Sequence, residues 1–318
     1  MLKNLTSLPM IAMLEIKNFH FKNNQAMEKY MNYFIHKIGG AGLMMLYQEL
    51  FDWVNYTLKD KGPDTQIVIV VSAFVKITRV LEKIFEKKLN GEIEKAMQIF
   101  EDDIRKIHLQ RCTSLSVKDT SILYEYFHEI EYFIRNGSID EKNPTISKAQ
   151  LLRFGELMSS EIFRQFLLGM NLSVKLIDAQ DMVYASGDDY CNSIPLQPQT
   201  SENISKAIAR EHGDKIILTQ GYISHKRLLG LDGSDLTASL ITLGLRSCNP
   251  NLSPTKTFWK DVDGVMVGGI VQEKMELNEY NSLETVPVRK DAINIDPKTE
   301  TVIRSFLNLE NPGTTIVR

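Results

Sequence analysis

Apolar residues form continuous runs of strand length, each bounded by polar or turn residues. These runs lie at 33–38, 66–74, 173–179, 215–223, 258–267 and 301–307. The uninterrupted run from Ile67 to Val71 is typical of a strand whose two faces are both covered by other elements. The pattern therefore predicts six β-strands, some of them fully buried.

Between the runs, apolar residues recur at the spacing of one helix face, and charged residues occupy the opposite face. This pattern predicts helices within 79–109, 120–137, 150–171 and 235–245. Strands that alternate with helices favour the α/β class, as a three-layer α/β/α fold with an open, mainly parallel sheet. The polar stretch 272–300 is predicted to be an irregular surface segment before the last strand.

Length and composition are those of an ordinary globular protein. With 318 residues, 43% of them hydrophobic, the chain can fill the core of one large α/β domain or two modest ones. Its 37 basic and 40 acidic side chains give a formal net charge of -3, which provides no electrostatic footprint for nucleic acid or an anionic membrane surface. We therefore expect neither as a partner.

The cysteines and the N-terminal segment indicate the cellular compartment of the protein. Cys112, Cys191 and Cys248 lack the spacing of a zinc site and of a disulfide framework, which favours a reducing compartment. The apolar patch near the N-terminus is interrupted by Glu15 and Lys17, so it is too short for a membrane span or a signal peptide. The sequence thus predicts a cytoplasmic protein.

The stretch YFIHKIGGAGL, residues 33–43, places Lys37, Gly39 and Gly40 at the end of the first predicted strand. Glycines let backbone N–H groups approach phosphate oxygens closely, and a lysine supplies positive charge to a transferred phosphoryl group. The same glycines are equally typical of a plain bend between two packed elements. The stretch alone does not decide between the two.

Two further stretches carry candidate substrate-binding side chains. Ser72 and Thr78 follow the most strand-like run, where hydroxyls can hold a polar substrate or simply cap a helix. Glu156 lies beside a glycine in a helical pattern, a position that a solvated surface residue occupies more often than a functional one.

Two more stretches carry acidic residues near predicted turns. Ser234 and Asp235 lead into a helix, where either is a typical N-cap. Asp261 and Asp263 lie where a strand ends, in the segment WKDVDGV. Paired aspartates can contact ribose, magnesium or ordering lysines, and Asp-Val-Asp-Gly is also good turn chemistry.

Taken in order, five motifs of this chain resemble those of the catalytic domain of aspartate kinases, members of the amino acid kinase family. The motifs are KIGGAG, VSAFVKIT, GELMSS, GLDGSDLTA and KDVDG. The resemblance covers roughly 33–270 and 301–316. It implies the amino acid kinase fold over 31–318, a nucleotide-binding part at about 200–318, an N-terminal extension at 1–30 and no ACT domain.

The resemblance also implies site residues and a reaction. The catalytic residues would be Lys37 and Asp235. The acceptor-binding residues would be Ser72, Thr78, Glu156 and Ser234, with Glu156 pairing the acceptor's ammonium group. The nucleotide-binding residues would be Gly39, Gly40, Lys260, Asp261 and Asp263. The implied reaction is phosphorylation, by ATP with Mg²⁺, of a carboxylate of aspartate or a related small amino acid to an acyl phosphate; the resemblance is also compatible with a homodimer.

The chain departs from the family pattern in the substrate turn. The family's arginine is Leu231 here, and the following glycine is Asp232. Loss of a bidentate arginine contact to a carboxylate is expected to weaken aspartate binding at least about tenfold. Lys226 and Arg227, just upstream, are candidates for a substitute charge.

Other departures affect the phosphate-binding residues. Ala41 and Gly42 replace two hydroxyl residues that follow the family's first glycines. A second phosphate-binding lysine is not recognisable at its usual place, which leaves Lys260 and Lys274 as candidates.

Three functions remain open from the sequence. The first is an active kinase of the aspartate kinase type, and the second is a non-catalytic relative that binds nucleotide or a partner. The third is a kinase of the same fold that phosphorylates a different acceptor, such as a hydroxyl or carbamate. The first requires Lys37, Glu156 and Asp235 to line one cleft at the carboxyl edge of the sheet.

Overall fold

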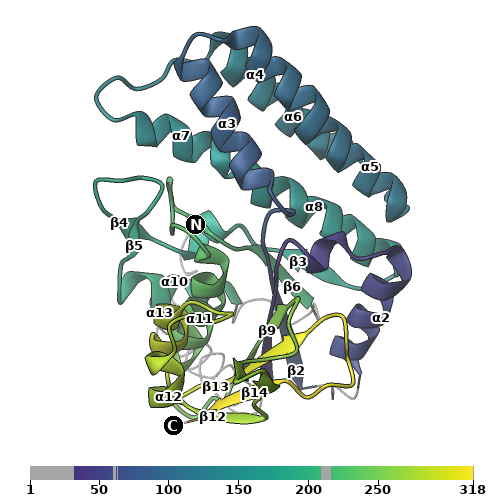
Figure 1. Cartoon of the computed structure of the whole chain (residues 1–318), viewed down its shortest axis with the longest axis vertical. Coiled ribbons are helices and arrows are strands. Elements are labelled where there is room, and N and C mark those ends of the chain that lie inside the picture. The colour runs from purple at the N-terminus through teal and green to yellow at the C-terminus, as the bar shows by residue number, and fades with distance from the viewer. Residues whose placement is uncertain (1–31, 60–61, 63, 209–215, 318) are drawn as a thin grey trace, which may run out of the picture.

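An eight-stranded sheet forms the centre of the computed structural model, which describes residues 32–59, 62, 64–208 and 216–317 (Figure 1). The strand order is β12-β14-β13-β9-β1-β2-β6-β3, and every neighbouring pair is parallel except β13 and β14. The strands are β1 (Asn32–Ile38), β2 (Thr65–Val71), β3 (Val174–Leu176), β6 (Ile216–Gln220), β9 (Thr255–Lys260), β12 (Lys274–Glu276), β13 (Glu300–Ser305) and β14 (Thr314–Val317).

Three two-stranded antiparallel ribbons accompany the sheet. They are β4 (Ala185–Ser186) with β5 (Ile194–Pro195), β7 (Ile223–Ser224) with β8 (Arg227–Leu228), and β10 (Met266–Val267) with β11 (Ile270–Val271). The ribbon of β4 and β5 lies wholly in a segment that the sequence left unassigned, whereas β7 and β10 each begin within a predicted strand run.

Helices occupy the four predicted helical regions, with breaks, and further helices lie in segments for which the sequence predicted none. They are α2 (Tyr47–Leu58), α3 (Ile77–Leu89), α4 (Ile93–Ile99), α5 (Lys106–Ser114), α6 (Ser121–Asn136), α7 (Pro144–Leu152), α8 (Phe154–Gly169), α9 (Ala179–Met182), α10 (Gln199–Ile208), α11 (Gly233–Cys248), α12 (Leu277–Ser282) and α13 (Lys290–Asn294). A 3-10 turn, η1 (Gly42–Met44), and a π-helical turn, η2 (Phe100–Arg105), complete the set. The single helical pattern at 79–109 is broken because Gly91 has a left-handed φ of 74°, which ends α3.

The two faces of the sheet are covered by different helices, which confirms the predicted three-layer α/β/α fold. Ile67, Ile69 and Val71 of β2 belong to a core that includes residues of α2 and α8, whereas Val68 and Val70 belong to a core with α10 and α11. Successive strand residues point to opposite faces, so a continuous apolar run is what a doubly covered strand requires. In Figure 1, α3 to α7 form a helical lobe beyond one end of this sheet.

The segment 272–300 is not irregular, which corrects the prediction. It contains β12, α12 and α13, and Tyr280 of α12 is fully buried with its hydroxyl hydrogen-bonded to the carbonyl of Val288 at 2.5 Å. The apolar residues here are too few and too widely spaced to form a visible period, and tertiary packing on α11 and β14 decides the structure. The predicted N-terminal extension, 1–30, lies outside the described residues. In the part of the chain that the structure describes, no helix is both long and apolar enough to cross a bilayer.

Lys256 of β9 is a fully buried lysine. Its ammonium donates hydrogen bonds to Ser239 Oγ at 3.1 Å and to the carbonyl of Ala292 at 3.4 Å. Burial lowers the pKa of Lys256 from its ordinary 10.5 to about 8, and Asp296 opposes this shift only in part.

We expect Lys256→Met to remove a pH dependence of stability. Between pH 8 and 10.5 the unfolded wild-type chain holds the Lys256 proton and the folded chain does not, so the free energy of unfolding rises with pH by up to about 1.4 kcal/mol per unit. Urea denaturation of both proteins from pH 7.5 to 10 measures the difference between them. Equal pH slopes for the two would contradict a lowered Lys256 pKa.

Candidate active site

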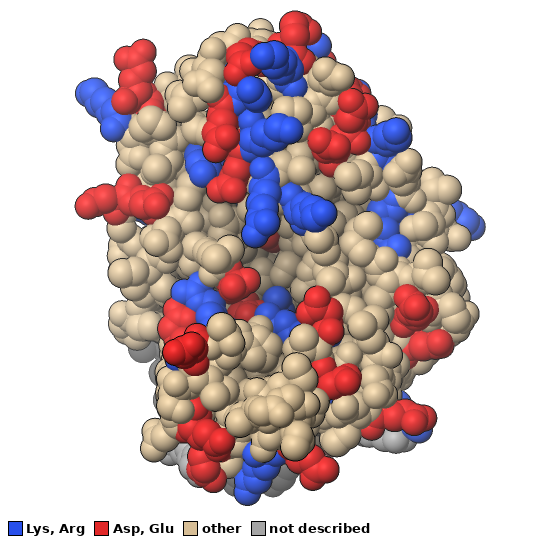
Figure 2. All heavy atoms as spheres, viewed as in Figure 1, with Lys and Arg blue, Asp and Glu red and all other residues tan. Residues whose placement is uncertain are grey.

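A cavity of about 760 Å³ opens where the parallel strands end. The cavity is lined by residues at or within two positions of the ends of five parallel strands, β1, β2, β6, β9 and β13. These residues are Lys37, Ser72, Tyr222, Lys260 and Phe306. Figure 2 shows the hollow in the middle of one face, with basic side chains above it and both basic and acidic side chains below it. Its position at the carboxyl ends of parallel strands is the usual place for a ligand in an open α/β sheet.

Two lysines share one buried carboxylate at the floor of this cavity. Lys37 Nζ lies 2.8 Å from Asp235 Oδ1, and Lys260 Nζ lies 2.9 Å from Asp235 Oδ2. Asp235 is fully buried, whereas both lysines line the cavity. The three residues carry a net charge of +1, with the positive groups toward the cavity, which suits an anion.

Strand register explains how the two lysines meet. β1 and β9 pair in parallel with Lys37 opposite Phe258, so Lys260, two residues further on, points to the same face of the sheet as Lys37. Helix α11 packs on that face and supplies Asp235 from its first turn. The arrangement therefore depends on three elements that are far apart in the sequence.

The charge balance of this cluster follows from burial and proximity. Burial by itself raises the pKa of Asp235, but the positive charges of Lys37 and Lys260 outweigh it and hold the pKa below its ordinary value. Burial and the nearby Lys37 lower the pKa of Lys260, while Asp235 partly restores it. Asp235 thus stays ionised and keeps two like charges side by side.

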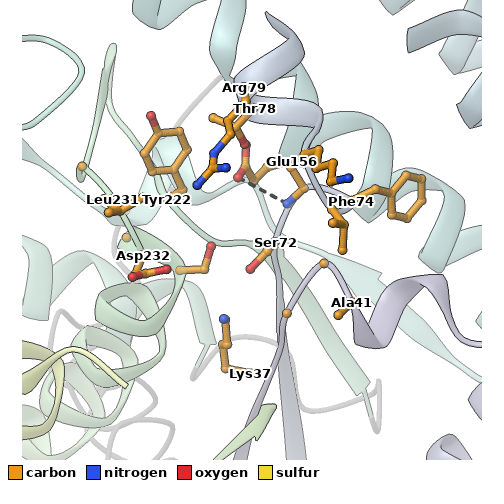
Figure 3. Close-up of a pocket in the computed structure, with 18 of the residues that line it drawn as sticks. Lys37, Ala41, Ser72, Phe74, Thr78, Arg79, Glu156, Tyr222, Leu231 and Asp232 are labelled. Carbon is orange, nitrogen blue, oxygen red and sulfur yellow. Dashed lines mark hydrogen bonds between the residues drawn. The ribbon is translucent and has the colours of Figure 1, made fainter. Parts of the chain in front are cut away.

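Glu156 contributes a second buried carboxyl group to the same cavity. It lies in the first turn of α8 with 3% of its surface exposed, and its Oε1 accepts a hydrogen bond from the backbone N–H of Ala73 at 3.3 Å (Figure 3). Its Oε2 is buried with no hydrogen-bond partner among the described residues. Burial raises the pKa of Glu156 to about 8, against the opposing effects of the Ala73 hydrogen bond and Lys37.

The glycine turn after β1 is held tightly against the segment after β2. A Cβ atom on Gly40 would lie 2.3 Å from the carbonyl oxygen of Ala73 and 2.8 Å from the amide nitrogen of Val75. Only glycine fits there, because both neighbours are backbone atoms. Gly39 and Gly40 both line the cavity. The turn can therefore pack closely against the segment after β2 and still present its backbone N–H groups to a phosphate, as predicted.

The structure brings together most of the predicted site residues. Those that line the cavity are Lys37, Gly39, Gly40, Ser72, Thr78, Glu156, Ser234, Lys260 and Asp261. Asp235 lies directly behind Lys37 and Lys260. Asp263 is the exception: it lies in an exposed bend, outside the residues that line the cavity, because the chain turns away after Asp261.

The candidates for a substitute cation were wrong. Arg227 lies over the ring of Tyr190, with its guanidinium carbon 3.6 Å from the ring centroid, and donates to the carbonyl of Gly187. Lys226 lines a separate small cavity of about 20 Å³. Lys226 lies in the turn between β7 and β8 and Arg227 begins β8, and neither lines the large cavity.

Sequence reasoning missed Arg79 and Tyr222, which line the cavity. Arg79 directly follows the predicted Thr78 in the first turn of α3, so its position next to a strand end was a usable signal. Lys274, the other candidate phosphate lysine, is an exposed residue of the edge strand β12 and does not line the cavity. Lys260 does.

We expect Glu156 to give the folded protein a pH-dependent stability. The pKa of Glu156 is about 8 in the folded chain and ordinary, near 4.5, in the unfolded one, so the folded state holds more protons between these values. The free energy of unfolding therefore falls as pH rises through this window, by up to about 1.4 kcal/mol per unit.

The measurement is chemical denaturation of wild type and Glu156→Gln between pH 5 and 8. The variant keeps an oxygen that can accept from Ala73 and has no titrating proton, so its stability should fall less steeply. An identical decline in both proteins would show that Glu156 titrates normally.

Comparison with known proteins shows similarity to a family sequence model, to individual proteins in sequence and to solved structures. A sequence model of the amino acid kinase family matches residues 32–305. Aspartokinase 1, chloroplastic, of Arabidopsis thaliana is 27% identical over 215 residues, covering 64% of this chain and 36% of that protein. The bifunctional aspartokinase/homoserine dehydrogenase of Buchnera aphidicola is 25% identical over 305 residues, covering 88% of this chain and 36% of that protein.

Solved structures show the same fold. E. coli aspartokinase III, in complex with lysine and aspartate, superposes with a TM-score of 0.74 at 18% identity, covering 90% of this chain and 64% of that one. Clostridium acetobutylicum aspartate kinase gives a TM-score of 0.67 at 20% identity, covering 90% of this chain and 62% of that one.

The chain spans 36 to 40% of the length of the curated relatives it matches. The chain belongs to the amino acid kinase family, and the relatives that it resembles are aspartokinases.

Proposed function

We propose that the protein is an ATP-dependent kinase that phosphorylates a carboxylate of aspartate, or of a related small amino acid, to an acyl phosphate. The observation that carries the proposal is the pair of lysines bridged by Asp235, on the same cavity as the buried carboxyl group of Glu156. A solved E. coli aspartokinase III holds aspartate and ADP, which supports the same two ligand classes for this chain. A homodimer remains a prediction.

The bonds that form and break in the proposed reaction indicate what the side chains must do. A carboxylate oxygen of the acceptor attacks the γ-phosphorus of ATP, and the bond from that phosphorus to the bridging oxygen of ADP breaks. The acceptor carboxylate is already ionised at neutral pH, so the reaction needs no general base. Positioning and stabilisation of negative charge are what remains for the protein to supply.

Lys37 and Lys260 are placed for that stabilisation. Both ammonium groups lie at the cavity floor and are held by Asp235, so they are oriented before the nucleotide arrives. Asp235 itself has both oxygens within ion-pair distance of a lysine, and it acts as a positioning residue for the two cations. The backbone turn at Gly39 and Gly40 lies beside them and can approach phosphate oxygens closely.

Glu156 is suited to an ammonium group of the acceptor. Its buried Oε2 has no hydrogen-bond partner among the described residues, and its raised pKa shows that the ionised form lacks sufficient stabilisation there. An acceptor ammonium would supply the missing charge, lower the pKa of Glu156 and form a charge-assisted hydrogen bond.

Magnesium fits this site only as a companion of the nucleotide. No group of three or more His, Cys, Asp or Glu side chains in the described ranges could hold a metal ion by itself. Magnesium on ATP is usually held by phosphate oxygens, water and one or two carboxylates, and Asp232 and Asp261 line the cavity as candidates. Bound there, the ion would neutralise phosphate charge.

A different acceptor is the second candidate function. Leu231 and Asp232 line the cavity in the turn before α11, where the family pattern implied by the motif resemblance has an arginine and a glycine. An apolar and an acidic side chain at these positions disfavour an acidic acceptor near this wall. For this reason, hydroxyl and carbamate compounds are included among the acceptors tested below.

We expect Lys37→Met and Lys260→Met each to lower kcat about 100-fold or more, because each removes a cation that stabilises the transferred phosphoryl group. Lys274→Met is the matched control, since this exposed lysine lies outside the cavity and its loss should leave kcat unchanged. ADP release is measured with aspartate and with a panel of amino acids, carboxylates and hydroxyl compounds, after circular dichroism confirms folding.

The outcomes separate the candidate functions. Turnover of an acidic amino acid that depends on Lys37 supports the proposal, and fastest turnover of a hydroxyl or carbamate compound supports the second candidate. Binding of ATP without turnover of any acceptor would identify a non-catalytic relative. Turnover that survives Lys37→Met at the wild-type rate would place the chemistry elsewhere.

A further inference from the structure

Arg79 is a cavity cation that none of the ion pairs at the site uses. It is the third residue of α3, its side chain is exposed, and it lines the cavity. Among the described residues, no hydrogen bond, ion pair or ring contact involves its guanidinium. In Figure 3 the guanidinium extends from α3 into the cavity, in the region of Glu156 and Tyr222.

The wall that carries the turn before α11 offers no such charge. Leu231 is 85% exposed and Asp232, in a left-handed conformation with φ of 54°, brings a carboxylate. In Figure 3 these two residues lie on one side of the cavity, Arg79 and Glu156 lie at the top and Lys37 lies at the bottom. Arg79 of α3 can therefore supply a positive charge to an acidic group of the ligand, whereas the turn that contains Leu231 and Asp232 cannot.

The other charged groups at the rim are less suited to this task. Glu82, one turn along α3, is paired with Lys148 at 2.9 Å. Lys76 also lines the cavity, but a lysine is a point charge on a flexible stem, whereas a guanidinium matches both oxygens of a carboxylate. Arg79 is thus the rim cation with the geometry for a two-oxygen anion.

We propose that Arg79 binds a carboxylate of the acceptor, in place of the arginine that the motif resemblance implies at the position of Leu231. This inference rests on the proposed function and deepens it, because it defines the substrate class. Ammonium and carboxylate groups on one carbon need neighbouring partners, which Glu156 and Arg79 provide at one end of the cavity. The second carboxylate of the acceptor would then reach Lys37, so the acceptor is an amino dicarboxylate.

The test compares aspartate with β-alanine, which keeps the amine and one carboxylate and lacks the second. In Arg79→Ala, the KM for aspartate should rise at least about tenfold, while the KM values for β-alanine and ATP stay within about twofold. Arg79→Lys should recover only part of the aspartate affinity, because lysine cannot donate in the same forked geometry.

Two further variants serve as control and rescue. Lys76→Ala removes a neighbouring cavity cation and should leave the KM for aspartate unchanged. Leu231→Arg, added to Arg79→Ala, places a guanidinium in the turn before α11 and should restore part of the aspartate affinity. A raised KM for ATP in Arg79→Ala, or a loss of aspartate affinity in Lys76→Ala instead, would overturn the assignment.

Binding distinguishes a failure of this inference from a failure of the proposed function. If the wild type turns over no acceptor but binds aspartate by calorimetry, loss of that binding in Arg79→Ala still supports Arg79 as the carboxylate partner. Turnover of aspartate with a KM that Arg79→Ala leaves unchanged would overturn the role of Arg79 alone. A wild type that neither binds nor phosphorylates aspartate or any related small amino acid would overturn both.

Discussion

One buried carboxylate shared between two lysines is the interaction on which the candidate site depends. Without Asp235, the ammonium groups of Lys37 and Lys260 would repel each other in a region with little water to screen them. Removing one partner of a buried ion pair typically costs about 3–5 kcal/mol, because the remaining charge has no compensation. The cluster therefore couples the fold to the site: three elements must pack correctly before two cations can face one ligand.

The parallel sheet supplies the rest of the geometry. Its parallel strands end at one edge, so residues at the ends of β1, β2, β6, β9 and β13 meet around one cavity although they come from distant parts of the sequence. Helices cover both faces of the sheet, and a shift of one residue in any central strand would turn apolar side chains toward the wrong layer. The core thus fixes the register, and the register fixes which side chains reach the cavity.

Asp235 and Glu156 show how two buried carboxyl groups acquire opposite properties. Burial disfavours ionisation of both, and the neighbouring charges decide the outcome. Two lysines keep Asp235 ionised. Glu156 accepts one backbone hydrogen bond, its Oε2 has no partner in the part of the chain that the structure describes, and its pKa rises to about 8. One group is already satisfied by the protein, and the other is suited to an external cation. That difference assigns positioning to Asp235 and ligand binding to Glu156.

The sequence by itself determined the main strands, the helices of four regions and the ordered motifs that place Lys37, Glu156 and Asp235, because hydrophobic period and turn residues are local properties. It did not determine the structure of 272–300, where few apolar residues mark a period, or the exit of Asp263 from the site. Only the tertiary structure decided that Lys260, and not Lys274, joins Lys37, and that Arg79 extends into the cavity while Lys226 and Arg227 turn away. The physical reason is that a side chain's neighbours depend on strand order and register across the whole sheet, which no local pattern records.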